Sequence, residues 1–232
     1  MPYLKPSGYK IPKEVVEHTP DIKKKEAVFT KKKGPFSKFK QIGFDRKKNW
    51  IDYFPSDIKD RLYHTHIQSK DWKVYFICTP SIIDLISYYT ERKTNNIPIQ
   101  GIFVIDEKTG KNIGRTFYMF TDKTDKIIDD LYKRYKKVVS KKESDPFIKN
   151  LLLNCDEDTK KLLESNTDTD VFQKKQILFQ LLLEQKTNQN TNVVLSKKEY
   201  YDILTKDLGI KIRFVSMPGY KFNKEKFIFE KK

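Results

Sequence analysis

The chain has few cysteines that could cross-link it and no long apolar segment that could anchor it in a membrane. It has 2 cysteines among 232 residues, Cys78 and Cys155, and their spacing fits neither a disulfide framework nor a C-x-x-C motif. The longest apolar runs, such as IFVI and LLL, are too short to cross a bilayer, and the opening MPYLKPSGYK lacks the apolar segment of a signal peptide. We therefore expect a protein of the cytoplasm or a virion, with no membrane partner and no signal-peptide secretion.

Alanine and glycine are also scarce. The chain has one alanine, Ala27, and 8 glycines, whereas lysine, isoleucine and asparagine are abundant. Codons for the scarce residues are GC-rich and codons for the abundant ones are AT-rich, so the composition indicates a very AT-rich genome and is compatible with a viral or phage source. Part of the net charge of +16 is then mutational in origin, and the position of the charge is more informative than its total.

The positive charge is concentrated at the N-terminus. Residues 1–48 contain 14 Lys and Arg against 5 acidic residues, with prolines at 2, 6, 12, 20 and 35 and no sustained apolar period. This composition predicts an extended basic arm, and neutralising phosphates or docking on neighbouring subunits are its expected uses. The partner-binding residues that we expect in it are Lys23, Lys24, Lys25, Lys31, Lys32, Lys33, Lys38, Lys40, Arg46, Lys47 and Lys48.

The rest of the chain predicts an α+β fold, a small mixed or antiparallel sheet packed with several helices. Residues 49–143 are expected to form an α+β core, with a short helix at 56–63, a strand at 72–78, a helix from 79 capped by Thr79, and a hairpin at 101–120. A long amphipathic helix is expected at 124–142. Residues 144–209 are expected to be a helical region and 210–232 a C-terminal hairpin that packs on the core.

Two helices of the helical region carry specific signals. The segment 170–185, DVFQKKQILFQLLLEQ, is apolar over so wide an arc that it should be buried on several sides or lie in an interface. The segment 196–209 begins with a capping box, Ser196 with Glu199, and ends before Gly209.

The stretch LYHTHIQSKDW, residues 62–72, contains two of the three histidines. His64 and His66 are two apart, so on an extended chain they point to the same side and could share a ligand. His18 lies in the basic arm, an H-x-H-x-D pattern fails because position 68 is Gln68, and acids such as Asp71 have no predictable position. We therefore expect a solvated or hydrogen-bonded pair at the entrance to a strand, with no metal and no cofactor.

One catalytic alternative remains open, a metal-free RNA- or DNA-acting enzyme. It would use His64, His66 or Lys73 as the base near a strand, with Tyr75 and Arg115 available to hold the scissile phosphate. Phosphate-binding loops and other hydrolase motifs are absent from the sequence.

A second basic cluster, KRYKKVVSKK, follows three aspartates in the expected helix 124–142. Its residues could track a nucleic-acid backbone, or they could be the cationic end that a helix dipole favours. The members that we expect to bind a partner are Lys133, Arg134, Lys136 and Lys137.

These features together predict a non-enzymatic structural or adaptor subunit of a large assembly, of the kind found in virions or phage connectors. It would dock through the basic arm on neighbouring protein subunits or on nucleic acid, and it would be part of a homo- or hetero-oligomer. The metal-free enzyme and a ribosome-associated or other nucleic-acid-binding protein are the alternatives.

Overall fold

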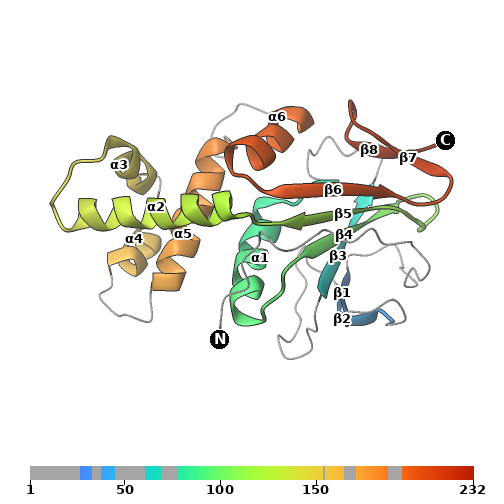
Figure 1. Ribbon diagram of the computed structural model, residues 1–232, viewed down its shortest axis with the longest axis horizontal. Helices are drawn as coiled ribbons and strands as arrows, with labels where there is room; N and C mark the ends of the chain where they lie inside the picture. Colours follow the sequence, from blue (N-terminus) through green and yellow to red (C-terminus); the bar gives the residue numbers. More distant parts are fainter. Residues whose placement is uncertain are drawn as a thin grey trace.

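The computed structural model describes residues 27–32, 38–44, 61–68, 78–153, 155–164, 171–187 and 195–232. Within these ranges the chain has an α+β fold, with six helices, a six-stranded mixed sheet and a separate two-stranded hairpin (Figure 1). The α+β class expected from the sequence is confirmed. No helix in the described ranges has both the length and the apolarity needed to span a membrane.

The main sheet has the strand order β2-β1-β3-β4-β5-β6. Its neighbours pair antiparallel, except that β3 and β4 are parallel and are joined through the helix α1. A parallel pair needs a crossover connection of this kind because its two strands run in the same direction. The bounds are β1 Ala27–Lys31, β2 Lys40–Phe44, β3 Arg61–Gln68, β4 Gln100–Asp106, β5 Asn112–Met119, β6 Lys211–Ser216 and α1 Ile82–Thr94.

Two segments of the expected N-terminal arm belong to this sheet. Strand β1 pairs with β2 on one side and with β3 on the other, and its residues Ala27, Val28 and Phe29 are buried. For these segments the expectation of an extended arm with little core was wrong. The short apolar group in AVFTK gives no strand signal beside so many lysines, and its neighbours in the sheet supply the hydrogen bonds that hold it. Residues 1–26 and 33–37 lie outside the described residues.

The first part of the body differs from its sequence prediction in two places. Residues 61–63, expected to end a short helix, begin strand β3. The helix expected from Thr79 is α1, but its N-cap is Ser81, whose side chain accepts a hydrogen bond from the Asp84 amide. The hairpin expected at 101–120 is confirmed as β4 and β5. The expected strand at 72–78 lies outside the described residues except for Cys78.

The helices predicted for the second half of the chain are present. Their bounds are α2 Asp122–Val139, α3 Pro146–Leu153, α4 Glu157–Glu164, α5 Val171–Lys186 and α6 Lys197–Asp202, which continues as a π-helical turn, Ile203–Asp207. The capping box of Ser196 with Glu199 is confirmed at the start of α6. The C-terminal hairpin consists of β7, Tyr220–Asn223, and β8, Ile228–Lys231. It is shorter than the hairpin expected at 210–232, because Lys211–Ser216 forms β6 and pairs with β5 in the main sheet.

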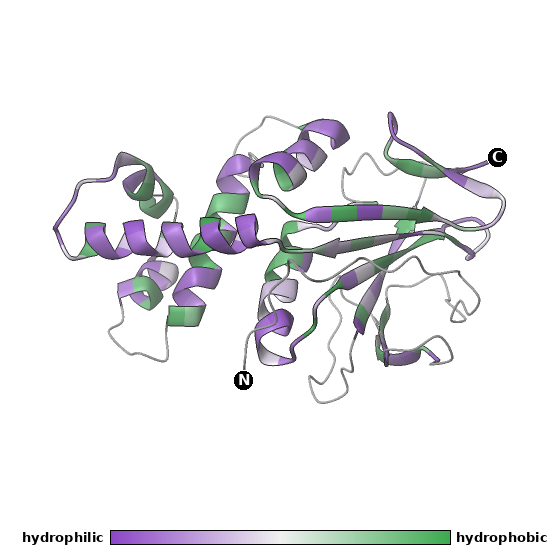
Figure 2. Ribbon diagram, viewed as in Figure 1, coloured by the Kyte–Doolittle hydropathy of each residue, from purple (hydrophilic) through white to green (hydrophobic). Residues whose placement is uncertain are grey.

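Helix α5 is buried on several sides, as its wide apolar arc predicts. It packs against α1, α2, α3 and α4, and its buried residues are Leu178, Phe179, Leu181, Leu182 and Leu183. Figure 2 shows hydrophobic residues along α5 and the central strands, whereas α2 presents mainly hydrophilic residues to the viewer. The burial of these leucines comes from contacts within one chain.

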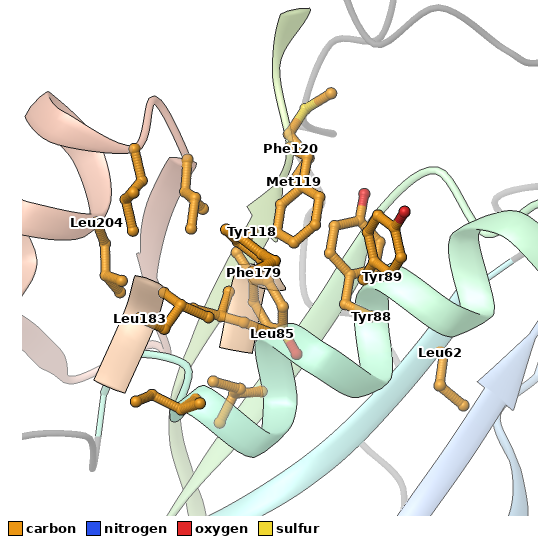
Figure 3. Packing of buried hydrophobic residues seen from close by; sticks show 14 of the residues in the cluster. Leu62, Leu85, Tyr88, Tyr89, Tyr118, Met119, Phe120, Phe179, Leu183 and Leu204 are labelled. Atoms are coloured by element: carbon orange, nitrogen blue, oxygen red, sulfur yellow. The ribbon is translucent and has the colours of Figure 1, made fainter. Parts of the chain in front are cut away.

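One core joins the sheet to the helices. Tyr88 of α1 packs edge-on against Phe120 at a ring-centroid distance of 4.8 Å, and Phe120 packs against Phe179 of α5 at 5.4 Å (Figure 3). Because α1 is held between the sheet and α5, its N-terminus has a fixed position relative to β3.

Candidate metal centre

Strand β3 presents its two histidines on one face of the sheet. Side chains alternate along a strand, so His64 and His66 share a face with Leu62 and Gln68, while Tyr63 and Thr65 point to the other face. Both histidine side chains are half-buried, with 16% and 14% of their surfaces exposed. They are therefore reachable by solvent but held by their surroundings.

The first turn of α1 brings a carboxylate to the same place. Asp84 is the third residue of the helix and forms a capping box with Ser81, whose backbone N–H and hydroxyl both donate to Oδ2 of Asp84, at 2.7 and 2.8 Å. A capping box is a local feature that fixes the side chain as well as the helix start. The other oxygen, Oδ1, is directed at His64.

The three side chains converge on one point. Nε2 of His64 lies 3.1 Å from Nε2 of His66 and 3.1 Å from Oδ1 of Asp84, and Nε2 of His66 lies 3.4 Å from Oδ2 of Asp84. The sequence offered no third ligand with a predictable position, and the structure places Asp84 beside the histidine pair. Within the described part of the chain, this is the one group of three or more His, Cys, Asp or Glu residues arranged to hold a metal ion.

No arrangement of protons turns all three contacts into hydrogen bonds. A contact between the two Nε2 atoms requires one of them to be an unprotonated acceptor, and that nitrogen then has no proton to donate to Asp84. If both nitrogens carry protons, each can donate to the carboxylate, but the two N–H groups then oppose one another across 3.1 Å. A cation at the centre would instead accept a lone pair from each of the two imidazole nitrogens and from one carboxylate oxygen.

The electrostatics of Asp84 favour the ionised form. Burial alone would raise the pKa of its carboxyl, but the charges and hydrogen bonds of His64 and His66 outweigh burial and hold that pKa well below its usual range. Asp84 is therefore a carboxylate at neutral pH.

The residues of the catalytic alternative are not all brought together. Arg115 of β5 is opposite Phe103 of β4, which is opposite Thr65 of β3, so the guanidinium lies on the face of the sheet away from the histidines. It packs over the Phe103 ring at 4.8 Å, and burial lowers its pKa to about 10. Expecting Arg115 beside the histidines was therefore wrong. Lys73 and Tyr75 lie outside the described residues.

The described lysines of the expected arm have different environments. Lys31 is buried in β1 with its ammonium 4.9 Å from the centre of the Phe39 ring, so it does not present its charge to a surface partner. Lys32, Lys38 and Lys40 are exposed. The remaining basic residues predicted for this segment lie outside the described ranges.

The basic cluster of α2 is largely engaged in ion pairs within the chain. Arg134 makes a two-pronged pair with Asp145, with N–O distances of 2.6 and 2.8 Å, and Lys137 pairs with Glu143 at 2.8 Å. Lys133 lies 3.6 Å from Asp130, and Lys136 lies over the Tyr132 ring. Exposed pairs of this kind stabilise little, but they reduce the net positive potential that a phosphate backbone would meet.

No family model, curated protein or solved structure matches this chain. The chemistry of the site therefore has to be argued from its own geometry. From the sequence, the available signal for Asp84 was the Ser81-x-x-Asp84 capping pattern at the start of a helix. That pattern gives the position of the residue in the helix, but it gives no contact with a strand 18 residues earlier.

Proposed function

We propose that this protein is a metal-dependent hydrolase whose ion is held by His64, His66 and Asp84. The observation that carries the proposal is the convergence of three metal-ligating atoms from a strand and a helix N-terminus. Two imidazoles and one carboxylate form the ligand set of many catalytic zinc sites and of some iron sites.

The spacing of the donor atoms supports a metal at their centre. Zinc–ligand bonds of about 2.0–2.1 Å at tetrahedral angles place neighbouring donor atoms about 3.3–3.4 Å apart. Nε2 of His64 lies 3.1 Å both from Nε2 of His66 and from Oδ1 of Asp84, close to that spacing, and the ligand atoms of the three residues all lie within 4.8 Å of one another. Because Ser81 holds Oδ2 of Asp84, Oδ1 is the oxygen left to bind the ion. This division of roles is typical of metal centres, in which outer groups orient the ligands.

Three protein ligands and partial exposure favour a catalytic over a structural ion. Structural zinc sites are closed by four protein ligands, whereas catalytic sites keep one position for water or substrate. A zinc ion in such a site lowers the pKa of its water to about 7 and polarises a carbonyl or phosphoryl oxygen. The reaction class is therefore hydrolysis of an amide, an ester or a phosphoester.

The first test measures metal binding. Protein stripped with a chelator should take up a single zinc ion per chain, and Asp84→Asn should weaken the affinity by at least about 100-fold, since losing an outer partner alone costs 10- to 100-fold. Asp156→Asn is the matched control, because Asp156 also accepts a helix N-terminal N–H, that of Thr159 at 2.7 Å, and does not belong to the group that His64 and His66 form with Asp84. Failure of the wild type to bind zinc, or equal affinity in Asp84→Asn, contradicts the proposal.

The second test separates this hydrolase from the metal-free nuclease that uses His64, His66 and Lys73. The zinc-loaded protein is assayed on chromogenic esters, peptides, RNA and DNA, with and without chelator. We expect any turnover to stop on chelation and to return with zinc. Cleavage of RNA or DNA that survives chelation would favour the metal-free enzyme.

The assembly-subunit function predicted from the sequence concerns another part of the chain. It depends on lysine-rich segments of residues 1–48, most of which lie outside the described residues, and it stays a prediction together with the cytoplasmic or virion location. The two functions are compatible, because a basic docking segment and a hydrolytic centre in the body would use different residues.

A further inference from the structure

The peptide group between Pro80 and Ser81 connects the metal centre to a distant helix. Its N–H, that of Ser81, donates to Oδ2 of Asp84 at 2.7 Å. Its carbonyl oxygen, that of Pro80, accepts a hydrogen bond from the hydroxyl of Tyr200 at 2.8 Å. Tyr200 lies in α6, 120 residues further along the chain, and its side chain is fully buried.

The two hydrogen bonds are mechanically and electronically linked. A peptide group is planar, and in the trans form its carbonyl and N–H point in opposite directions, so rotating the plane displaces both bonds together. Donation to the carbonyl also polarises the peptide and makes its N–H a stronger donor. The hydroxyl of Tyr200 therefore acts on Asp84 through one rigid group.

Other contacts leave this peptide group few ways to move. Thr116 of β5 donates to the carbonyl of Cys78 at 2.6 Å, which fixes the segment two residues earlier. Pro80 has a restricted backbone, and the carbonyl of Ser81 accepts from the Leu85 amide at 3.1 Å as α1 begins. With both sides fixed, the bond from Tyr200 sets the tilt of the plane between them.

We infer that Tyr200 is a positioning residue of the metal centre, which orients Asp84 through the Pro80–Ser81 peptide group. This inference rests on the proposed function, since it concerns the ligand geometry of the same ion. It assigns to α6 a role at a site formed by residues that precede it by more than a hundred positions.

The chain offers a close control for this role. Tyr88 is also fully buried, and its hydroxyl also donates to a proline carbonyl, that of Pro98 at 2.5 Å. Pro98 follows the C-terminal end of α1, whereas Pro80 precedes its N-terminal end. Tyr88→Phe and Tyr200→Phe thus remove the same chemical group from the same kind of bond, at opposite ends of the helix that carries Asp84.

The experiment compares zinc affinity and cobalt spectra of the full-length wild type and the two variants. Zinc affinity is measured by competition with a chromogenic chelator, and Co²⁺ in place of zinc gives a visible spectrum that reports ligand geometry. We expect Tyr200→Phe to weaken zinc binding by about tenfold and to change the cobalt spectrum, in line with other outer-shell changes. Tyr88→Phe should lose comparable thermal stability but bind zinc like the wild type, with an unchanged spectrum.

Each other outcome counts against the inference. If the wild type binds zinc and Tyr200→Phe binds it equally well with the same spectrum, the positioning role fails while the proposed function stands. If both variants weaken binding equally, the effect is general destabilisation. If Tyr200→Phe does not fold, with or without zinc added during refolding, the hydroxyl serves the fold and not one ligand. If the wild type binds no zinc, the inference and the proposed function fail together.

Discussion

Gly114→Ala should destabilise the protein by forcing the ring of Phe229 from its place. Gly114 lies in β5 beneath Phe229 of β8, and a Cβ atom at this position would come within 2.4 Å of three atoms of that ring. Ordinary contacts between such atoms begin near 3.4 Å. An added Cβ would therefore overlap the ring by about 1 Å, which requires the ring or the strand to move.

The ring has little freedom to move. Phe229 is 1% exposed, and its backbone is fixed to the end of β3 by Gln68, which donates to its carbonyl at 2.8 Å and accepts from its N–H at 3.0 Å. If the ring stays, overpacking costs about 1–3 kcal/mol. If it leaves, the loss approaches the about 3–5 kcal/mol of a Phe→Ala change.

We therefore expect Gly114→Ala to lower the free energy of unfolding by about 2–4 kcal/mol, measured by chemical denaturation with an unchanged m value. The melting temperature should fall by about 2–4 °C for each kcal/mol in a chain of this size. Phe229→Ala alone should cost about 3–5 kcal/mol. The double variant should cost less than the sum by about 1–3 kcal/mol, because the added methyl then fills the space of the missing ring. Strict additivity, or a Gly114→Ala variant within about 0.5 kcal/mol of the wild type, would refute the reasoning.

Two further predictions concern other parts of the chain. Leu178→Asp places a carboxylate at a fully buried position of α5 and should lower the free energy of unfolding by about 3 kcal/mol or more in denaturation experiments. Light scattering should show no change of oligomeric state. A stable variant that dissociates an oligomer would show instead that this face is an interface. Replacing Lys23, Lys24 and Lys25 with Gln should reduce the salt dependence of duplex DNA binding: the slope of log affinity against log salt concentration should fall by about 2.7 if all three contact phosphates. The same change at Lys133, Lys136 and Lys137 should reduce the slope less, because Lys133 and Lys137 are ion-paired. Equal slopes for the wild type and the first variant would contradict nucleic-acid binding by residues 23–25.

Local patterns in the amino-acid sequence were enough to predict the features that depend on near neighbours in the chain. The amphipathic period of α2, the wide apolar arc of α5 and the capping box at Ser196 are local patterns, and the structure has these elements where the patterns predict them. A hairpin was likewise expected at 101–120, and it is present as β4 and β5, whose strands are adjacent in the sequence. Each of these features is fixed by interactions within a few residues.

Features that depend on pairing between distant segments became visible only in the folded chain. Strand β1 is a strand because β2 and β3 flank it, and its lysine-rich surroundings gave no sign of this. The histidine pair forms a candidate metal site only together with Asp84, which the crossover from β3 through α1 brings to within 3.4 Å of both histidines. The order of residues shows an i, i+2 pair and a capping box, but a metal site needs their relative positions in space. Those positions are set by how α1 packs between the sheet and α5, which is a property of the whole core.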